Sequence, residues 1–296
     1  MEFKKCLIVS LTSMLILSWV TTGKSQDKQS SNKPVRRNLA QLYAETQSRS
    51  DGKDAVYHMK GHVYAFIPGQ RPQRLFGMEG YNIRRRIETP EKDGFFNATR
   101  EIVFYTDPQT EEILLEWSNP FTQQKNEVFH IANDPVNFRF RVREGRIFNV
   151  TLDGQRELGE IAAPQEWDDY YVWHKDAFPF YQLPGWEKNY TSAELFDFYA
   201  PKKDLDNAGI PNVMVSWTRV GPWLPWMCMD KHEGLMIYHA RSKLLESWDQ
   251  LPERIKKTVK EKFPAYQTAP GEVDPRRPNV TSWTYYAEEM KRRQTQ

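Results

Sequence analysis

The chain has 296 residues, of which 39% are apolar, 14% aromatic and 27% charged. This mixture excludes a disordered, collagen-like or disulfide-scaffold protein, and the length is sufficient for one large core or two small ones. The 41 basic and 39 acidic residues give a formal net charge of +2, so no global positive field favours nucleic acid as a partner.

Residues 1–25 have the three parts of a secretory signal peptide. Lys4 and Lys5 precede an apolar run over 7–20, and small residues follow around Gly23. The apolar run is shorter than the roughly 20 residues that a membrane-spanning helix needs. We therefore expect cleavage of the signal, no stable membrane anchor on the mature chain, and export to the periplasm or the medium.

Residues 26–51 are expected to form a polar tether followed by a short helix. The stretch 26–34 is rich in Gln, Lys, Ser and Asn, whereas Leu39, Leu42 and Tyr43 recur at helical spacing. After Asp51-Gly52 the residue pattern changes from helical spacing to short strand-like runs. We expect a single β-rich domain over 52–296.

The region from about residue 54 to 240 is a series of short runs rich in β-branched and aromatic residues. Turn-forming Gly, Pro, Asn and Asp separate the runs, so neighbouring antiparallel strands are predicted. Long helical crossovers are absent, which argues against a parallel sheet. The predicted strands cover residues 55–67, 73–87, 95–106, 112–118, 126–132, 136–143, 146–152, 156–162, 168–174, 191–199, 212–220 and 234–241.

About a dozen strands in one open sheet would leave long unpaired edges. The sequence therefore predicts a mainly β protein, an antiparallel meander closed or nearly closed into a barrel-like sheet. From about residue 242 a helical and Pro-rich extension is expected. Leu251, Ile255 and Val259 indicate a helix that ends near Pro264, and a last helix is predicted from about residue 281 to 293.

The stretch 217–241 contains three tryptophans and three methionines. Pro222 and Pro225 prevent regular strand pairing there, so an irregular loop with large apolar side chains is predicted. Two interpretations remain open. The loop either closes one end of the barrel as part of the core, or it forms the wall of a pocket for a planar apolar ligand.

Polar side chains end the apolar faces of the strands beside this loop. Arg219 follows Trp217 on one face, and His239 follows Ile237 on another. Such groups lie either at a solvent-exposed barrel mouth or in a buried polar set built for a ligand. The predicted ligand-binding residues are Asn82, Arg84, Trp217, Arg219, Trp223, Trp226, Met227 and His239.

Few residues suggest catalysis or metal binding. His239, Glu79 and Tyr105 are candidates for general acid and base groups, although a structural ion pair is the alternative for Glu79. Weak candidates for a metal are Cys228, Asp230 and His232, which alternate along the loop but lack an established ligand spacing. No phosphate loop, nucleophile elbow or dinucleotide fingerprint is present, so no cofactor is expected.

Several aromatic motifs are distinctive. In chain order they read VYAFIPG, LFGMEGYNIRRR, REIVFYTDPQTEEILLEWSNP, HIANDPVNF, SWTRVGPWLPWMCM and RRPNVTSWTYY. Over nearly all of residues 50–286 the chain resembles the bacterial family of exported proteins catalogued as domain of unknown function 1838. The resemblance implies an exported, β-rich protein and supplies no catalytic residue. Where the family usually has Gly after the Pro-Trp-Met-X-Met run, this chain has Asp230.

Three functions are compatible with these residues. The leading hypothesis is binding of a small apolar or aromatic molecule in a Trp- and Met-lined barrel pocket. A cofactor-independent isomerase, cyclase or lyase with acid and base groups in the same pocket is the second. The third is a carbohydrate-active or carbohydrate-binding protein, which would present aromatic platforms in an open cleft and, if hydrolytic, a carboxylate pair. The oligomeric state stays open.

Overall fold

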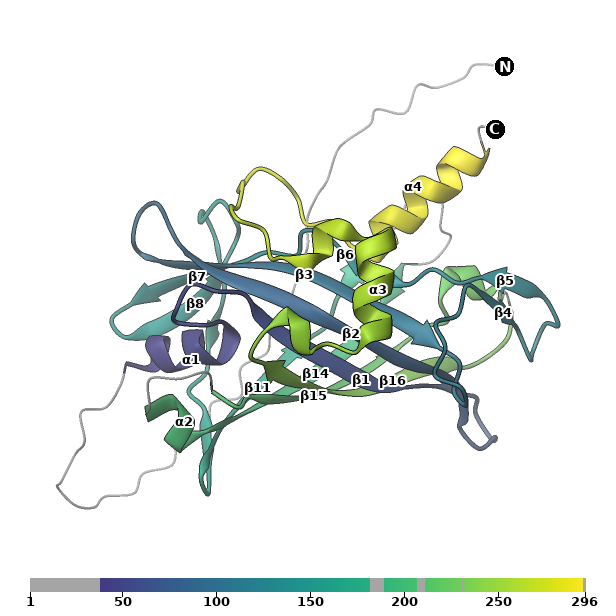
Figure 1. Cartoon of the computed structure of the whole chain (residues 1–296), viewed down its shortest axis with the longest axis horizontal. Helices are drawn as coiled ribbons and strands as arrows, with labels where there is room; N and C mark the ends of the chain where they lie inside the picture. Colours follow the sequence, from purple (N-terminus) through teal and green to yellow (C-terminus); the bar gives the residue numbers. More distant parts are fainter. Residues whose placement is uncertain (1–37, 182–188, 207–210, 230, 295–296) are drawn as a thin grey trace.

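The computed structural model describes residues 38–181, 189–206, 211–229 and 231–294 (Figure 1). The predicted signal peptide and the tether over 26–34 lie outside these residues. None of the described helices is long and apolar enough to cross a membrane.

A 12-stranded sheet makes up most of the described chain, which confirms a mainly β, antiparallel fold. The spatial order is β10, β11, β14, β15, β16, β1, β2, β3, β7, β8 and β9, with β6 also beside β3. Its strands are β1 (Ala55–Phe66), β2 (Gln73–Glu88), β3 (Gly94–Thr106), β6 (Ile131–Asn133), β7 (Phe138–Arg143), β8 (Arg146–Val150), β9 (Glu157–Ile161), β10 (Gln165–Trp167), β11 (Tyr170–Ala177), β14 (Ala193–Pro201), β15 (Met214–Gly221) and β16 (Leu235–Leu245).

Two small ribbons and several helices complete the fold. The ribbons pair β4 (Glu116–Ser118) with β5 (Lys125–Glu127) and β12 (Phe180–Tyr181) with β13 (Tyr190–Thr191). The helices are α1 (Leu39–Gln47), α2 (Lys202–Asp206), α3 (Glu253–Lys262) and α4 (Ser282–Gln294), with short 3₁₀ turns η1 (Pro225–Met227), η2 (Trp248–Gln250) and η3 (Pro264–Gln267). The helices predicted before residue 48 and after residue 250 are thus present.

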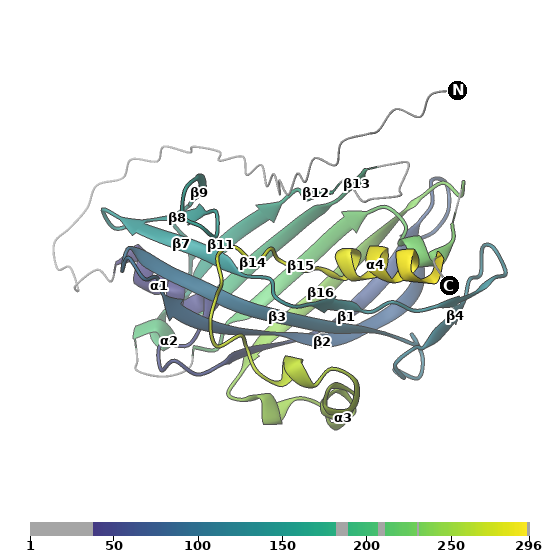
Figure 2. The ribbon, with the colours of Figure 1, turned by 90° about the horizontal axis from the view of Figure 1, so that it is seen from above.

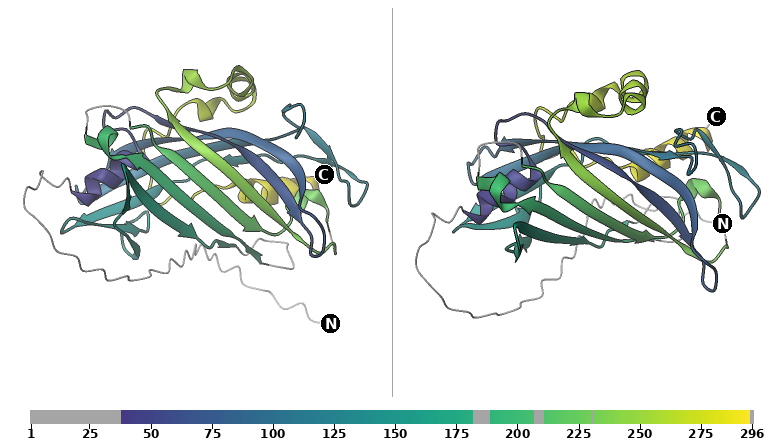
Figure 3. Two further views of the ribbon diagram at one scale, coloured as in Figure 1. Left: turned by 90° about the horizontal axis from the view of Figure 1, so that it is seen from below. Right: turned by 60° about the horizontal axis from the view of Figure 1, so that its bottom comes forward.

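The sheet curves strongly but is not closed into a barrel. In the described part of the chain β10 and β9 are its two ends, and no pairing joins them. Figures 2 and 3 show the curved sheet with α4 on its inner side and α3 on its outer side. Helices, rather than a further strand pair, connect the two halves, and so the predicted closure by hydrogen bonding is not seen.

Helix α1 fills one end of the concave face. Its Tyr43 ring lies 5.4 Å from the ring of Phe140 on β7 and 6.1 Å from that of Trp173 on β11. These strands belong to opposite halves of the sheet, so α1 bridges them. Around it lies the helix-end cluster, which includes Tyr43, Tyr57, Phe140, Trp173, Phe198 and Leu244.

The other end of the concave face is filled by the loop that contains η1. Trp226 packs against Phe76, Tyr105 and Trp117, with ring centroids 5.7 to 6.0 Å apart. We call this the loop-end cluster, which also includes Met59, Met78, Trp217, Met227 and Tyr238. Asn119 and Asn126 both donate to the Met227 carbonyl, at 2.7 and 2.9 Å, and so fix the loop in place.

The outer face is covered in part by α3. Ile255 and Val259 of this helix pack on Tyr81, Ile83 and Ile102 of the sheet in a separate apolar cluster. Successive side chains along each strand therefore point alternately into two apolar cores, one on each face of the same sheet.

Candidate functional site

Charged and amide side chains lie on the concave face beside its two apolar clusters. We call this set the polar belt, and it consists of Asn82, Arg84, Glu101, Lys175, Glu194 and Arg219. Strands β2 and β3 contribute its first half, and β11, β14 and β15 contribute the second. Every member is buried or half-buried. The belt is the candidate functional site because charges inside a sheet require a reason to be there.

The first half of the belt follows from the register of β2 and β3. Asn82 lies opposite Glu101 in this pairing, and both point to the concave side. The Arg84 guanidinium donates to the side-chain oxygens of Asn82 and Gln47, the latter at 3.0 Å, and lies 4.6 Å from the Tyr57 ring centroid. These partners are all neutral.

The Glu101 carboxylate accepts a hydrogen bond of 2.7 Å from Asn133 on β6. The same Asn133 accepts one of 2.8 Å from the backbone N–H of Ser282, where α4 begins. Asn133 therefore connects the belt directly to the helix that lies on the concave side.

The second half of the belt is equally constrained by register. Glu194 and Arg219 are direct neighbours on β14 and β15, and their closest ionic atoms are 3.7 Å apart. The Arg219 guanidinium lies within 5.1 to 5.7 Å of the ring centroids of Tyr238, Tyr190 and Trp283. Lys175 on β11 reaches across to β7, where its Nζ lies 4.5 Å from the Phe138 ring centroid.

The electrostatics show that the two halves influence each other. Burial, reinforced by the Glu101 carboxyl, raises the pKa of Glu194 to about 7. Burial also raises the pKa of Glu101, against the opposing effect of Asn133 and Arg84. The pKa of Lys175 falls to about 8, first because of burial and then because of the Arg84 charge. Proton transfer near neutral pH is therefore chemically accessible to this site.

A small cavity of about 20 Å³ lies beneath α4, next to the belt. Arg219, Tyr105 and Trp226 form its inner wall, and Trp283 and Tyr286 of α4 form its cover. Aromatic contacts hold the cover down, with 4.4 Å between the rings of Trp283 and Tyr190 and 4.9 Å between those of Tyr286 and Phe129.

Four residues from the sequence prediction share this environment. Asn82, Arg84, Trp217 and Arg219 all lie on the concave face. Trp226 and Met227 instead belong to the loop-end cluster, although Trp226 also reaches the cavity. Of the two interpretations of the loop, closure of one end of the core fits Met227, which is fully buried. Trp223 packs at the rim and donates to the His232 carbonyl at 3.0 Å.

The placement predicted for His239 is wrong. This residue is exposed on the outer face of β16, where its Nδ1 is 3.2 Å from the Thr218 hydroxyl, and it does not share a pocket with Arg219. Both faces of β16 carry apolar residues, and the concave one holds Met236, Tyr238 and Ala240 instead. The alternation of side chains along β16 does not by itself show which of its two faces is the concave one.

Glu79 also lies on the outer face. It forms ion pairs with His58 at 2.9 Å and with Arg254 of α3. Burial opposes its charge, but the hydrogen bonds from His58 and Arg254 prevail and lower its pKa to about 2. Glu79 thus attaches α3 to the sheet and is remote from the belt. Tyr105 does lie inside, with its hydroxyl 3.2 Å from that of Tyr238, and burial raises its pKa well above the usual value.

The weak metal candidates do not form a complete set. Asp230 lies outside the described residues, and Cys228 and His232 are exposed. Within the described ranges no group of three His, Cys, Asp or Glu side chains is placed to hold a metal ion.

Lys175, Glu194 and Asn133 were not among the residues singled out from the sequence. A signal for two of them was present. Glu194 continues the alternating row of Phe196 and Phe198, and Lys175 continues that of Trp173. A charge at the end of an aromatic row has the same form as the pattern that identified Arg219.

Comparison with known proteins shows the family to which the chain belongs. Residues 52–290 match the model of the family described as Protein of unknown function (DUF1838). The chain belongs to this family. No curated protein and no solved structure matches it significantly.

Proposed function

We propose that this protein binds a small molecule on the concave face of its sheet. The ligand has an apolar or aromatic body and a polar group that meets the polar belt. One observation carries the proposal: the Arg219 Nε lies 3.7 Å from the nearest Glu194 oxygen, beyond hydrogen-bond distance, and has no hydrogen-bond partner among the described residues, although Arg219 is only 7% exposed. An unsatisfied buried donor costs about 1–3 kcal/mol, which a ligand acceptor would offset.

The aromatic residues beside the belt supply the apolar half of the site. Tyr105, Trp226, Trp283 and Tyr286 surround the cavity, whose volume suits about one water molecule. A larger ligand therefore needs the rings of α4 to move aside. Trp283 lies over Arg219 in the structure, and we propose that the ligand body takes its place there.

Calorimetric titration of the full chain with two families of probes tests this proposal. Dodecanoate, dodecanol and dodecylammonium represent flexible ligands, and naphthylacetate, naphthylethanol and naphthylethylammonium represent aromatic ones. We expect at least one to bind with one-to-one stoichiometry, and Trp283→Ala to change its affinity. The matched control Trp248→Ala, under α3 on the outer face, should leave that affinity unchanged. Absence of binding by all six, or equal effects of both variants, would refute the proposal.

A second candidate function is acid and base catalysis without a cofactor, of an isomerase, cyclase or lyase type. The observation that favours it is the pKa of Glu194, raised by burial to about 7, beside Lys175 at about 8. A carboxyl and an amine with such values can accept and donate protons at neutral pH. Tyr105 remains a candidate donor, whereas His239 and Glu79 are on the opposite face.

This candidate is tested on whatever molecule co-purifies with the protein from its own host. The molecule is identified by native mass spectrometry and followed by NMR with fresh protein. Glu194→Gln should stop its conversion while preserving its binding. Conversion at an undiminished rate would exclude Glu194 as the proton-transfer group. Trp217 and Trp226 are buried on the concave face and form no platforms there, so they do not favour the carbohydrate alternative.

Export is part of the proposal and is supported by the arrangement of residues 1–25. N-terminal sequencing of the mature protein tests it, with a start near Gln26 expected. An intact Met1 on exported protein would contradict cleavage.

A further inference from the structure

We infer that the ligand carries an anionic group, such as a carboxylate, that binds between Arg84 and Lys175. The inference rests on the proposed function, since it assigns the charge of the molecule that the concave face takes. It also distinguishes these two cations from Arg219, which already has Glu194 beside it at 3.7 Å.

Arg84 and Lys175 are interior cations without a carboxylate in direct contact, and only at longer range do Glu101 and Glu194 stabilise their charges. Among the described residues no carboxylate lies within 4.0 Å of either group. Arg84 contacts the neutral Asn82, Gln47 and Tyr57, and Lys175 lies over the Phe138 ring. Amide oxygens and aromatic faces stabilise a cation, but they do not neutralise it. Buried charges in proteins are normally paired, so these two groups require an explanation.

The two cations also face each other across the concave side. Arg84 projects from β2 and Lys175 from β11, strands that belong to opposite halves of the sheet. They are close enough for the Arg84 charge to disfavour protonation of Lys175. One anion placed between them would relieve this repulsion and pair both groups at once.

The carboxyl groups of the belt do not take that role. Glu101 is bound to Asn133, and Glu194 lies beside Arg219. Burial raises the pKa of both carboxyls, to about 7 for Glu194, so part of the Glu194 charge is lost near neutral pH. With Arg84, Lys175 and Arg219 all present, the belt has an excess of positive charge. A cationic ligand is thereby disfavoured, and a neutral one leaves the pair unmatched.

Arg84 and Lys175 differ from Arg219 in exposure. Both residues are half-buried, whereas Arg219 is nearly sealed by three aromatic rings. Apolar residues flank the pair, because Tyr57 and Phe138 both belong to or pack on the helix-end cluster. The ligand class that fits is therefore an amphipathic anion whose charged end binds between the two cations.

Comparing the charged forms of each probe family tests the inference. We expect dodecanoate or naphthylacetate to bind at least about tenfold more tightly than the matching alcohol, and the ammonium form to bind most weakly. Lys175→Met should abolish the preference for the anion while leaving affinity for the alcohol unchanged, and Lys175→Arg should preserve it. Arg84→Gln is the independent second variant, with the same expected loss.

The control is Lys243→Met, which removes an exposed lysine on the outer face of β16 and should preserve the preference for the anion. Equal or tighter binding of an alcohol or ammonium probe would overturn the inference and leave the proposed function standing. The inference also fails if the anion preference survives in both Lys175→Met and Arg84→Gln. Failure of all six probes to bind would overturn both proposals together.

Discussion

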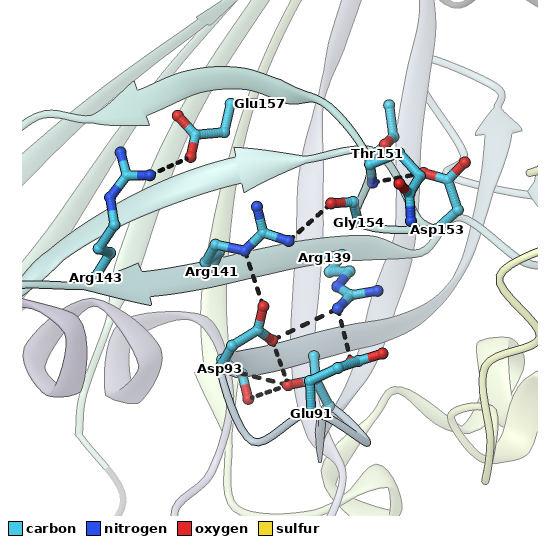
Figure 4. Close-up of polar contacts among 12 residues, drawn as sticks. Glu91, Asp93, Arg139, Arg141, Arg143, Thr151, Asp153, Gly154 and Glu157 are labelled. Carbon is cyan, nitrogen blue, oxygen red and sulfur yellow. Dashed lines mark hydrogen bonds and ion pairs between the residues drawn. The ribbon is translucent and has the colours of Figure 1, made fainter.

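The arginines of β7 and the cations Arg84 and Lys175 of the polar belt lie on the same sheet, but only the arginines of β7 have acidic side chains in contact. Arg139 pairs with Glu91 at 2.8 Å and Asp93 at 3.5 Å, and Arg141 pairs with Asp93 at 2.8 Å (Figure 4). Both also donate to carbonyl oxygens in the turn between β8 and β9. On the concave face, Arg84 and Lys175 have no such acidic partners.

The comparison distinguishes charges that hold the strands together from charges that remain available to a ligand. At β7 the chain supplies its own carboxylates from the turn between β2 and β3, so the guanidinium groups fasten three strands together. In the belt the same chemistry is left incomplete, because no carboxylate among the described residues contacts Arg84 or Lys175. A counter-charge from outside the chain is the simplest way to complete it.

Removal of Arg139 should give the largest loss of stability. Arg139 is 3% exposed, whereas the side chains of its partners Glu91 and Asp93 are 57% and 27% exposed. Arg139→Met deletes these partly exposed ion pairs, the hydrogen bond to the Leu152 carbonyl and the cation–π contact to Phe96, and leaves Asp93 paired with Arg141. We expect the free energy of unfolding to fall by about 2–4 kcal/mol. Urea denaturation measures this change, and the affinity for the anionic probe should stay the same. A loss of probe binding in the folded variant would contradict the division between the two regions.

Substitution of Glu194 should produce a pH-dependent effect. Its folded pKa of about 7 exceeds the usual 4.5, because burial and the nearby Glu101 disfavour the charged form. The folded protein binds more protons than the unfolded chain in this interval, so this group lowers stability as the pH rises from 4.5 to 7.

We expect Glu194→Gln to match the unchanged protein near pH 4 and to exceed its stability by about 2–3 kcal/mol at pH 8. Thermal and urea unfolding at several pH values measure the difference. The groups that face Glu194, namely Glu101, Lys175, Trp217 and Arg219, are retained in both proteins. A constant difference across the range would show that this carboxyl does not titrate as assigned.

Removal of Lys175 should have the opposite sign to removal of Arg139. Burial and the Arg84 charge lower its pKa to about 8, so the protonated group destabilises the fold at neutral pH. We expect Lys175→Met to raise the free energy of unfolding by about 1–2 kcal/mol at pH 7. This gain should shrink as the pH rises from 8 to 10.5. Lys175 of the unchanged protein is then neutral in the folded state, so burial of its charge no longer destabilises the fold. A loss of stability instead would show that Lys175 is adequately paired.

The smallest effect is expected at the exposed end of the arginine network. Arg143 pairs with Glu157 at 3.0 Å, and both side chains have substantial contact with solvent. Arg143→Gln should therefore change stability by less than about 1 kcal/mol. Differential scanning calorimetry would detect a larger loss, which would mean that the network acts as one unit.

The sequence predicted the strands well, because alternation and turn residues are local signals. Each predicted run contains strand, the helix near Ile255 occurs where periodicity places it, and the last helix begins where Thr281 or Ser282 can cap it. The run 126–132 divides into two strands, β5 and β6, which pair with different partners. Pairing depends on contacts between distant segments, so neither this division nor the open edge between β9 and β10 could be read locally.

The site was only partly predictable for a related reason. A period of two tells which residues share a face, and Trp217 and Arg219 were grouped correctly. It does not tell which face is inner when both carry apolar side chains, as in β16, and His239 was therefore placed on the wrong side. Lys175 and Glu194 become significant only because the sheet curves enough to bring them toward Arg84 and Glu101.

The polar belt also interrupts the apolar interior along β2 and β3, where Asn82, Arg84 and Glu101 lie between the two clusters, whereas Phe196 on β14 packs against both clusters. Parts of a structure that share few contacts can open separately. The end around Tyr43 and Trp173 and the end around Phe76 and Trp226 should therefore differ in their native-state hydrogen-exchange rates. A ligand that fills the belt would add contacts between the two ends, so the exchange rates of their amide protons would become slower and more alike.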